Sequence, residues 1–208
     1  MSARLQHPLL LRAAGLLLRG RHAGDGSLAS SDAVLAALPQ TLALRSASFA
    51  DHGAMPVRHA GAGVGANCSP ALAWTGLPAT ATHWLLLVED PDVPLAYAIV
   101  HALAWGPASV GALAEGALSR APLPAGVTLA VNGLGDAAYD GPRPLPGHGP
   151  HRYVFQLFAL AAEPPAGLAR EALMAWLRAH AIARGRLDGV FQRDWRGQPL
   201  TPANVAPA

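Results

Sequence analysis

Two carboxylates stand where an apolar segment ends. Asp90 and Asp92 flank Pro91 directly after the run HWLLLVE at residues 83–89. In extended backbone both carboxylates project to one side, because alternate residues of a strand share a face. Two like charges so close need a cation, a shared proton or a donor-rich ligand. The alternative is that Asp-Pro-Asp only ends a strand with turn-type hydrogen bonds, and this is the favoured interpretation for an isolated motif.

Histidines provide the second set of candidate groups. His101 lies within the apolar segment 97–105 (YAIVHALAW), where a lone histidine is more often a satisfied core residue than a ligand-binding group. The sequence Gly-His-Gly-Pro-His-Arg-Tyr at 147–153 adds two more where a Gly/Pro-rich loop enters an apolar strand. Within that loop, His148 is expected to be exposed.

The strand that follows the loop separates its polar residues by face. His151 and Tyr153 share one face, and Arg152 points to the other. We expect Arg152 to form a structural ion pair with a carboxylate, not to contact a ligand. If the apolar strands pair, Asp90, His101, His151 and Tyr153 converge on one pocket. Imidazoles there can donate to the oxygens of a small anion, and a carboxylate can hold a histidine tautomer or an ammonium group.

The same residues argue against catalysis and against a metal. No Gly-x-Ser-x-Gly elbow is present, and Cys68, next to Ser69, is interpreted as a small packing residue. No His-Glu-x-x-His motif occurs, and a Gly-Pro pair between His148 and His151 prevents regular helical spacing. The sequence therefore predicts a binding site with no metal and no cofactor, and metal binding is ranked below anion binding.

Strands must position these groups. Apolar or alternating segments predict strands at 41–49, 83–89, 97–105, 127–132 and 151–160. Helical spacing of apolar residues predicts one clear helix over 168–183. The Gly/Pro-rich stretches 53–70 and 136–150 must be turns and irregular backbone. The chain is therefore expected to be mainly β, with a helix near its C-terminal end.

Composition excludes several function classes. All 15 basic residues of the 208 are arginine, which rules out lysine Schiff bases, a lysine general base and a Gly-Lys-Ser/Thr phosphate loop. The formal net charge is only +2, without a dense arginine run, so nucleic-acid binding is not supported. The single cysteine excludes an internal disulfide and the multi-cysteine zinc patterns. Such a chain is compatible with reducing cytosol, and a cytoplasmic location is expected.

The N-terminal stretch contains leucine clusters and arginines but no acidic residue before Asp25. Arg12 and Arg19 interrupt the apolar residues, so neither a signal-peptide core nor a transmembrane segment is predicted. A short amphipathic helix followed by a flexible link at 22–31 is the favoured interpretation, with interfacial membrane contact as the minor alternative. The expected organisation is an extension at 1–45, one domain at 46–198 and a tail at 199–208.

Five segments, in order along the chain, resemble the phosphatidylethanolamine-binding proteins, also called the Raf kinase inhibitor protein family, and specifically their bacterial branch. The segments are Asn-Cys-Ser-Pro-Ala-Leu-Ala-Trp at 67–74, Asp-Pro-Asp-Val-Pro at 90–94, Val-His at 100–101, Tyr-Asp-Gly-Pro-Arg-Pro-Leu-Pro at 139–146, and the 147–153 segment. The order of the matches makes the resemblance specific. One departure is Ile99, which stands where the family usually has an aromatic residue.

The resemblance implies a mainly β, PEBP-like fold, with a large central sheet packed on a smaller one and a C-terminal helix. It also implies a pocket at one end for phosphate, acetate or a phosphoethanolamine head group. By that resemblance, the pocket is lined and supported by the following residues: Asp90, His101, His151 and Tyr153 as its lining, Pro91 and Pro142 at its rim, and Asp92 with Arg152 as braces of the loops.

We therefore expect a non-enzymatic protein that binds a small anion or phospholipid head group and regulates protein partners. Two alternatives stay open. One is a protease or kinase inhibitor that works by surface docking, and the other is a metal-assisted hydrolase that uses the Asp/His cluster. A homodimer formed through the N-terminal extension also stays open.

Overall fold

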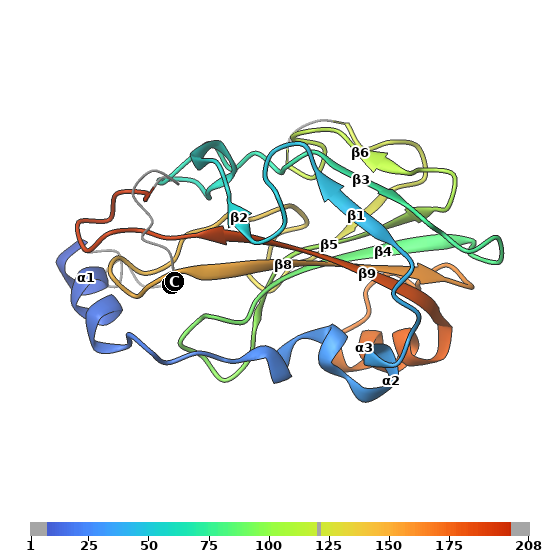
Figure 1. Ribbon diagram of the computed structural model, residues 1–208, viewed down its shortest axis with the longest axis horizontal. Helices are drawn as coiled ribbons and strands as arrows, with labels where there is room; N and C mark the ends of the chain where they lie inside the picture. Colours follow the sequence, from blue (N-terminus) through green and yellow to red (C-terminus); the bar gives the residue numbers. More distant parts are fainter. Residues whose placement is uncertain (1–7, 120–121, 201–208) are drawn as a thin grey trace.

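The structure is a computed structural model and describes residues 8–119 and 122–200. Two β-sheets form its framework (Figure 1). The strands are β1 (Ala43–Ser46), β2 (Gly53–Ala54), β3 (Leu72–Thr75), β4 (His83–Asp90), β5 (Ile99–Pro107), β6 (Ala112–Leu113), β7 (Thr128–Ala130), β8 (His151–Leu160) and β9 (Ala181–Phe191). The helices are α1 (Pro8–Leu17), α2 (Ala33–Ala36) and α3 (Arg170–His180), with short 3-10 turns at Asp25–Ser27, Ala29–Ser31 and Val57–His59.

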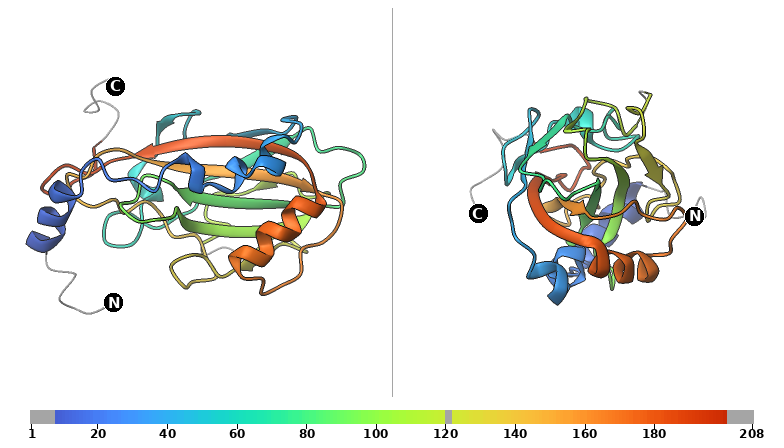
Figure 2. Two further views of the ribbon diagram at one scale, coloured as in Figure 1. Left: turned by 90° about the horizontal axis from the view of Figure 1, so that it is seen from below. Right: turned by 90° about the vertical axis from the view of Figure 1, so that its right-hand side faces the viewer.

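The large sheet has the strand order β2-β9-β8-β4-β5-β7, and the small sheet has the order β1-β3-β6. Every pairing is antiparallel except that of β2 with β9. The small sheet covers one face of the large sheet, and α2, α3 and the chain between α1 and α2 lie across the other face (Figure 2). The prediction of a mainly β fold with two sheets and a C-terminal helix is confirmed.

Strand β4 shows why the apolar runs are continuous. Its side chains alternate between two cores: Trp84 and Leu86 pack under the small sheet, whereas Leu85 and Leu87 pack under the helices. All four are buried. A strand covered on both faces has no solvent-facing position, so polar residues are absent from the middle of the run.

The sequence interpretation missed four strands, β2, β3, β6 and β9, of which β9 is the longest. We expected a helix to residue 183, but α3 ends at His180 and β9 begins at Ala181, paired with β8 along its whole length. The residues of β9 do alternate between buried and half-buried positions. The inward positions are mostly alanine and glycine, which give a weak apolar signal, and Gly185 must be small because a Cβ there would lie 2.4 Å from the carbonyl oxygen of Leu42.

Other boundaries also differ from expectation. Strand β5 begins at Ile99 instead of Tyr97, and β1 spans only residues 43–46 of the expected 41–49. The residues before Ile99 form the loop that returns from β4, so the apolar character of residues 97–98 does not reflect strand pairing.

The sheet places the candidate polar residues at one end. Strand β4 ends where its antiparallel neighbours β5 and β8 begin. A β-bulge lies in the β4–β5 pair: Val88 pairs with Ala102 and Glu89 with Val100, so His101 has no counterpart. Bulges re-aim side chains and recur beside functional sites.

Candidate functional site

The central contact of the site joins a carboxylate to an imidazole. Asp90 Oδ2 lies 2.7 Å from His151 Nδ1, and both residues are buried. The other carboxylate oxygen, Oδ1, accepts a hydrogen bond from the backbone amide of Asp92 at 2.8 Å. Both oxygens of Asp90 are therefore engaged, which suits the task of holding His151 in one tautomer better than the task of binding an ammonium group.

His148 extends this contact to a third group. Its Nδ1 lies 2.8 Å from His151 Nε2, and the side chain is buried. The expectation that His148 is exposed in its loop is therefore wrong. The flanking glycines explain the difference, because Gly147 (φ 77°) and Gly149 (φ 128°) adopt backbone conformations that fold the loop over His151. A glycine on each side of a histidine was the only sequence signal for this arrangement.

Two physical effects set the charge of His148. Burial lowers its pKa below the usual value, and the neighbouring His151 and His22 lower it further, while the carbonyl groups of Leu18 and Arg21 act in the opposite direction. The imidazole is therefore held mainly in its neutral form.

His101 faces the same space from β5. Its Nδ1 lies 2.6 Å from the carbonyl oxygen of Asp140, so that nitrogen carries the proton of the neutral ring. Its Nε2 is buried without a hydrogen-bond partner and lies 4.0 Å from Asp90 Oδ2. Burial lowers the pKa of His101. A protonated His101 would present an Nε2–H donor to a ligand in this space.

Tyr153 completes the lining. Its ring packs edge-on against His101, with the ring centroids 5.0 Å apart. Burial, followed by the charge of Asp90, raises the pKa of Tyr153 well above its usual value of 10, so the hydroxyl stays protonated. The structure thus brings together the four residues predicted to line the pocket.

The two prolines predicted at the rim are both buried and bound through their carbonyl groups. Pro142 accepts a hydrogen bond from the Gly61 amide at 3.0 Å, and Pro91 accepts one from the Gly24 amide at 2.9 Å. Each proline therefore joins its loop to a segment distant in the sequence.

Asp92 and Arg152 form a separate pair. Arg152 Nε and a terminal guanidinium nitrogen donate to the two oxygens of Asp92 at 2.9 and 2.8 Å, and the Arg152 amide donates to Asp92 Oδ2. Burial alone would raise the pKa of Asp92, but its hydrogen bonds with Arg152 hold the pKa below its usual value. Because the chain turns after Asp90, the two carboxylates have different partners and do not share one ligand.

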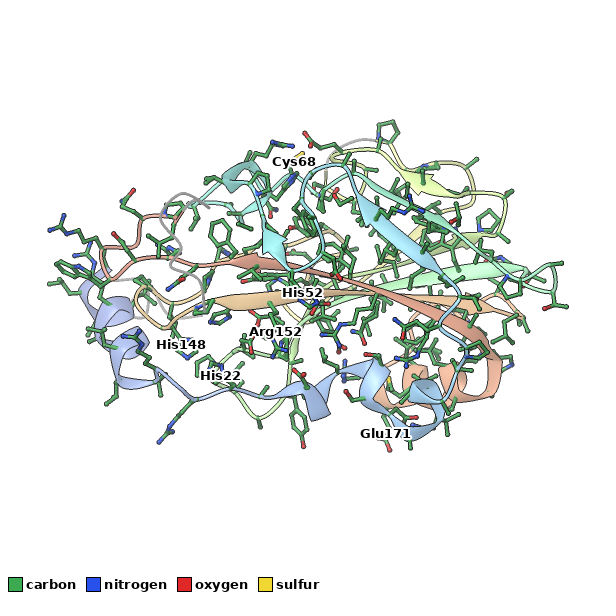
Figure 3. All side chains as sticks on the ribbon, in the orientation of Figure 1. His22, His52, Cys68, His148, Arg152 and Glu171 are labelled. Atoms are coloured by element: carbon green, nitrogen blue, oxygen red, sulfur yellow. The ribbon has the colours of Figure 1, made fainter. Side chains whose placement is uncertain are left out.

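Residues 18–25, called the strap, cross the mouth of this cluster. The Ala23 amide donates to the carbonyl oxygen of Val93 at 2.9 Å. His22 Nδ1 lies 3.1 Å from the carbonyl oxygen of Asp92, and the His22 ring lies 5.4 Å from the His148 ring (Figure 3). Asp25 adds an ion pair with Arg152 at 2.7 Å. The strap closes the site to solvent, and the sequence contained no signal for this closure.

Within residues 8–119 and 122–200, no group of three or more His, Cys, Asp or Glu side chains is arranged to hold a metal ion. Over the same residues, no helix is long and apolar enough to cross a membrane.

Known proteins resemble this chain in both sequence and fold. A family model described as phosphatidylethanolamine-binding protein matches residues 45–192. A "UPF0098 protein" of Methanothermobacter thermautotrophicus is 33% identical over 156 residues, which cover 72% of this chain and 98% of the relative. This chain therefore belongs to the phosphatidylethanolamine-binding protein family.

Solved structures agree with this assignment. Escherichia coli YbcL, described as a member of the mammalian PEBP family, superposes with a TM-score of 0.68 at 27% identity, covering 73% of this chain and 98% of YbcL. A putative PEBP homologue from Chlamydia trachomatis, CT736, gives a TM-score of 0.65 at 28% identity, covering 74% of this chain and 99% of CT736.

One relative bears on location. A protein of Mycobacterium tuberculosis named "Putative lipoprotein LppC" is 35% identical over 160 residues, which cover 76% of this chain and 74% of the relative. Family membership is thus compatible with more than one location, and a cytoplasmic location stays a prediction.

Proposed function

We propose that this protein binds a small oxyanion, inorganic phosphate or the phosphoethanolamine head group of a lipid, in the pocket lined by Asp90, His101, His151 and Tyr153, and that it does not turn the ligand over. The observation that carries the proposal is the buried Nε2 of His101, which has no hydrogen-bond partner. A buried polar atom without a partner is costly unless a ligand or water satisfies it.

The chemistry of the lining supports an anion as that ligand. Tyr153 keeps its hydroxyl proton, which hydrogen-bonds to Asp90 and is a donor for which an incoming anion can compete. His101 becomes a donor at Nε2 when protonated, and an anion would stabilise that charge. Asp90 Oδ2 holds His151 Nδ1 and also lies 4.0 Å from His101 Nε2, so the carboxylate favours the protonated form of His101. The name of the matching family, phosphatidylethanolamine-binding protein, agrees with a phosphate-containing ligand.

The hydrogen-bond partners in the cluster support binding without catalysis. Asp90, His148 and His151 form a chain of hydrogen bonds. Among the described residues, neither a serine nor a cysteine joins this chain, so the imidazoles have no serine hydroxyl or cysteine thiol to activate. Regulation of a protein partner stays a prediction from the sequence, because the family motifs do not include a partner surface.

Histidine NMR titration with phosphate and with phosphoethanolamine tests the proposal. We expect saturable shifts of the His101 and His151 ring signals and at least a tenfold loss of affinity in His101→Gln, because one charged donor is lost. His83→Gln is the matched control, since His83 lies at the other end of β4. Unshifted ring signals, or equal affinity in the two variants, would overturn the proposal. Release of phosphate from phosphoethanolamine, followed by phosphorus NMR, would overturn the non-enzymatic assignment.

A further inference from the structure

Helix α1 exposes its apolar side. Leu9, Leu10, Leu16 and Leu17 are all exposed, Leu17 to 83%. At about 100° per residue these four leucines lie within an arc of about 120°. On the opposite side, Gly15 is so close to the loop before His148 that a Cβ there would lie 2.0 Å from the carbonyl oxygen of Pro146. The helix is therefore attached through Gly15, with Leu11 and the following Leu18 half-buried on that side, and it presents a second set of leucines outward.

An aromatic residue extends the leucine stripe at the same end of the molecule. Trp195 is exposed, and the guanidinium groups of Arg196 and Arg12 lie 5.0 Å and 6.0 Å from its ring centroid. A guanidinium nitrogen of Arg12 also donates to the carbonyl oxygen of Arg196 at 2.9 Å. Leucine, tryptophan and arginine side by side are the composition of helices that lie in the interface of a bilayer.

The charge around this surface is mainly positive. Arg19 and Arg21 follow α1 directly, and both are exposed. The sequence has no acidic residue before Asp25. Asp194, next to Trp195, accepts a hydrogen bond from the Gln198 amide within its own turn. The positive charge beside the leucine stripe therefore has little compensation from the chain itself.

We propose that α1 and Trp195 form a docking surface for a lipid bilayer that contains anionic head groups. The leucines would enter the interface, and the arginines would contact the head groups. A two-fold pair of this chain would bring identical positive patches together and leave their repulsion unbalanced. The inference does not depend on the pocket ligand. Docking through α1 would nevertheless orient the pocket relative to the bilayer, because α1 packs against the loop that carries His148 and continues into the strap (Figure 1).

Co-sedimentation with vesicles tests the docking surface. With vesicles of phosphatidylglycerol and phosphatidylcholine, we expect at least tenfold stronger binding than with phosphatidylcholine alone, weakening as salt is added. Leu10→Glu should lower the binding about tenfold, because a charge replaces an inserted side chain. Leu95→Glu is the matched control, since Leu10 and Leu95 are each 56% exposed and Leu95 lies on the loop between β4 and β5. Arg19→Gln and Arg21→Gln should each lower the binding about fivefold at low salt.

A pocket variant separates this inference from the proposed function. Asp90→Asn should bind the same vesicles as strongly as the unaltered protein, while its phosphate affinity falls. Loss of vesicle binding in Asp90→Asn would assign the membrane contact to the pocket and overturn the inference. Equal binding by Leu10→Glu and Leu95→Glu, or no preference for anionic vesicles, would also overturn it. So would sedimentation equilibrium showing a dimer that Leu10→Glu dissociates, because a second copy would then cover the leucines.

Discussion

Two carboxylates that are close in sequence, Asp90 and Asp92, pair with the neighbouring β8 residues His151 and Arg152, and the surroundings of the two pairs differ in how completely polar groups are satisfied. Asp92 and Arg152 meet through two side-chain hydrogen bonds, and Arg152 has a further partner in Asp25. Asp90 and His151 lie in a buried cluster in which the Nε2 of His101 has no partner. Both pairs are satisfied in themselves, but the cluster around the second contains the unpartnered Nε2 atoms of His101 and His148. Neighbouring residues of one motif therefore lie in different surroundings: one pair holds two loops together, and the other belongs to the cluster for which we propose a ligand.

The largest effect is expected from a substitution that breaks the Asp92–Arg152 pair. Asp92→Ala leaves the half-buried guanidinium of Arg152 with only the exposed Asp25, and we expect a loss of about 2 kcal/mol in the free energy of unfolding. Urea denaturation measures this loss. The phosphate affinity of the folded variant should change less than about twofold, because Asp92 does not line the pocket. A variant as stable as the unaltered protein would contradict the bracing role.

The next largest effect concerns the cluster of Asp90, His101 and Tyr153. Tyr153→Phe removes a buried hydroxyl that hydrogen-bonds to Asp90 and for which the ligand can compete. We expect phosphate affinity to fall about fivefold, equivalent to about 1 kcal/mol, and the free energy of unfolding to fall by about 1 kcal/mol, because a buried hydrogen bond is lost. Isothermal titration calorimetry checks the affinity, with Tyr97→Phe as a control because the Tyr97 ring is exposed. Equal affinities in the two variants would remove Tyr153 from the ligand site.

A fall in pH should destabilise the cluster that contains His101 and His148 more than it destabilises the Asp92–Arg152 pair. Burial lowers the pKa of His101 and His148 below 6.5, so the unfolded chain binds more protons than the folded one as pH falls through that value. The free energy of unfolding therefore falls by about 1 kcal/mol between pH 7.5 and pH 5.5. Urea denaturation across this range measures the slope, and His101→Gln should reduce it. A slope that His101→Gln leaves unchanged would assign the acid sensitivity to other groups.

The smallest expected effect concerns the strap. Asp25→Ala removes an ion pair between an exposed carboxylate and a half-buried guanidinium, so stability should fall by less than about 0.5 kcal/mol. The strap should be held less firmly over the site. We therefore expect phosphate to associate faster in stopped-flow measurements. Asp136→Ala is a control, because Asp136 is exposed and outside the strap. Equal association rates would show that ligand entry does not depend on this contact.

Much of the fold and of the candidate site could be predicted from local pattern. The run at 83–89 is continuous because β4 is covered on both faces, and Asp90 marks its end. Strand β9 escaped prediction because alanine and glycine fill its inward positions, where close packing against Leu42 demands small residues. His148 escaped because its burial depends on the positive φ angles of the glycines beside it and on the strap above it.

The sequence by itself determined the residue types at the site, their order along the chain and the strands that carry them. These features depend on residues that are close in sequence, so local sequence patterns and the order of the family motifs are enough to predict them. The tertiary structure alone decided that the strap closes the site, that His148 joins His151, and that α1 faces outward with its leucines. Each of these depends on contacts between distant segments, such as His22 with Asp92 and Gly15 with Pro146, and no periodicity in a single segment encodes which distant segment it will meet.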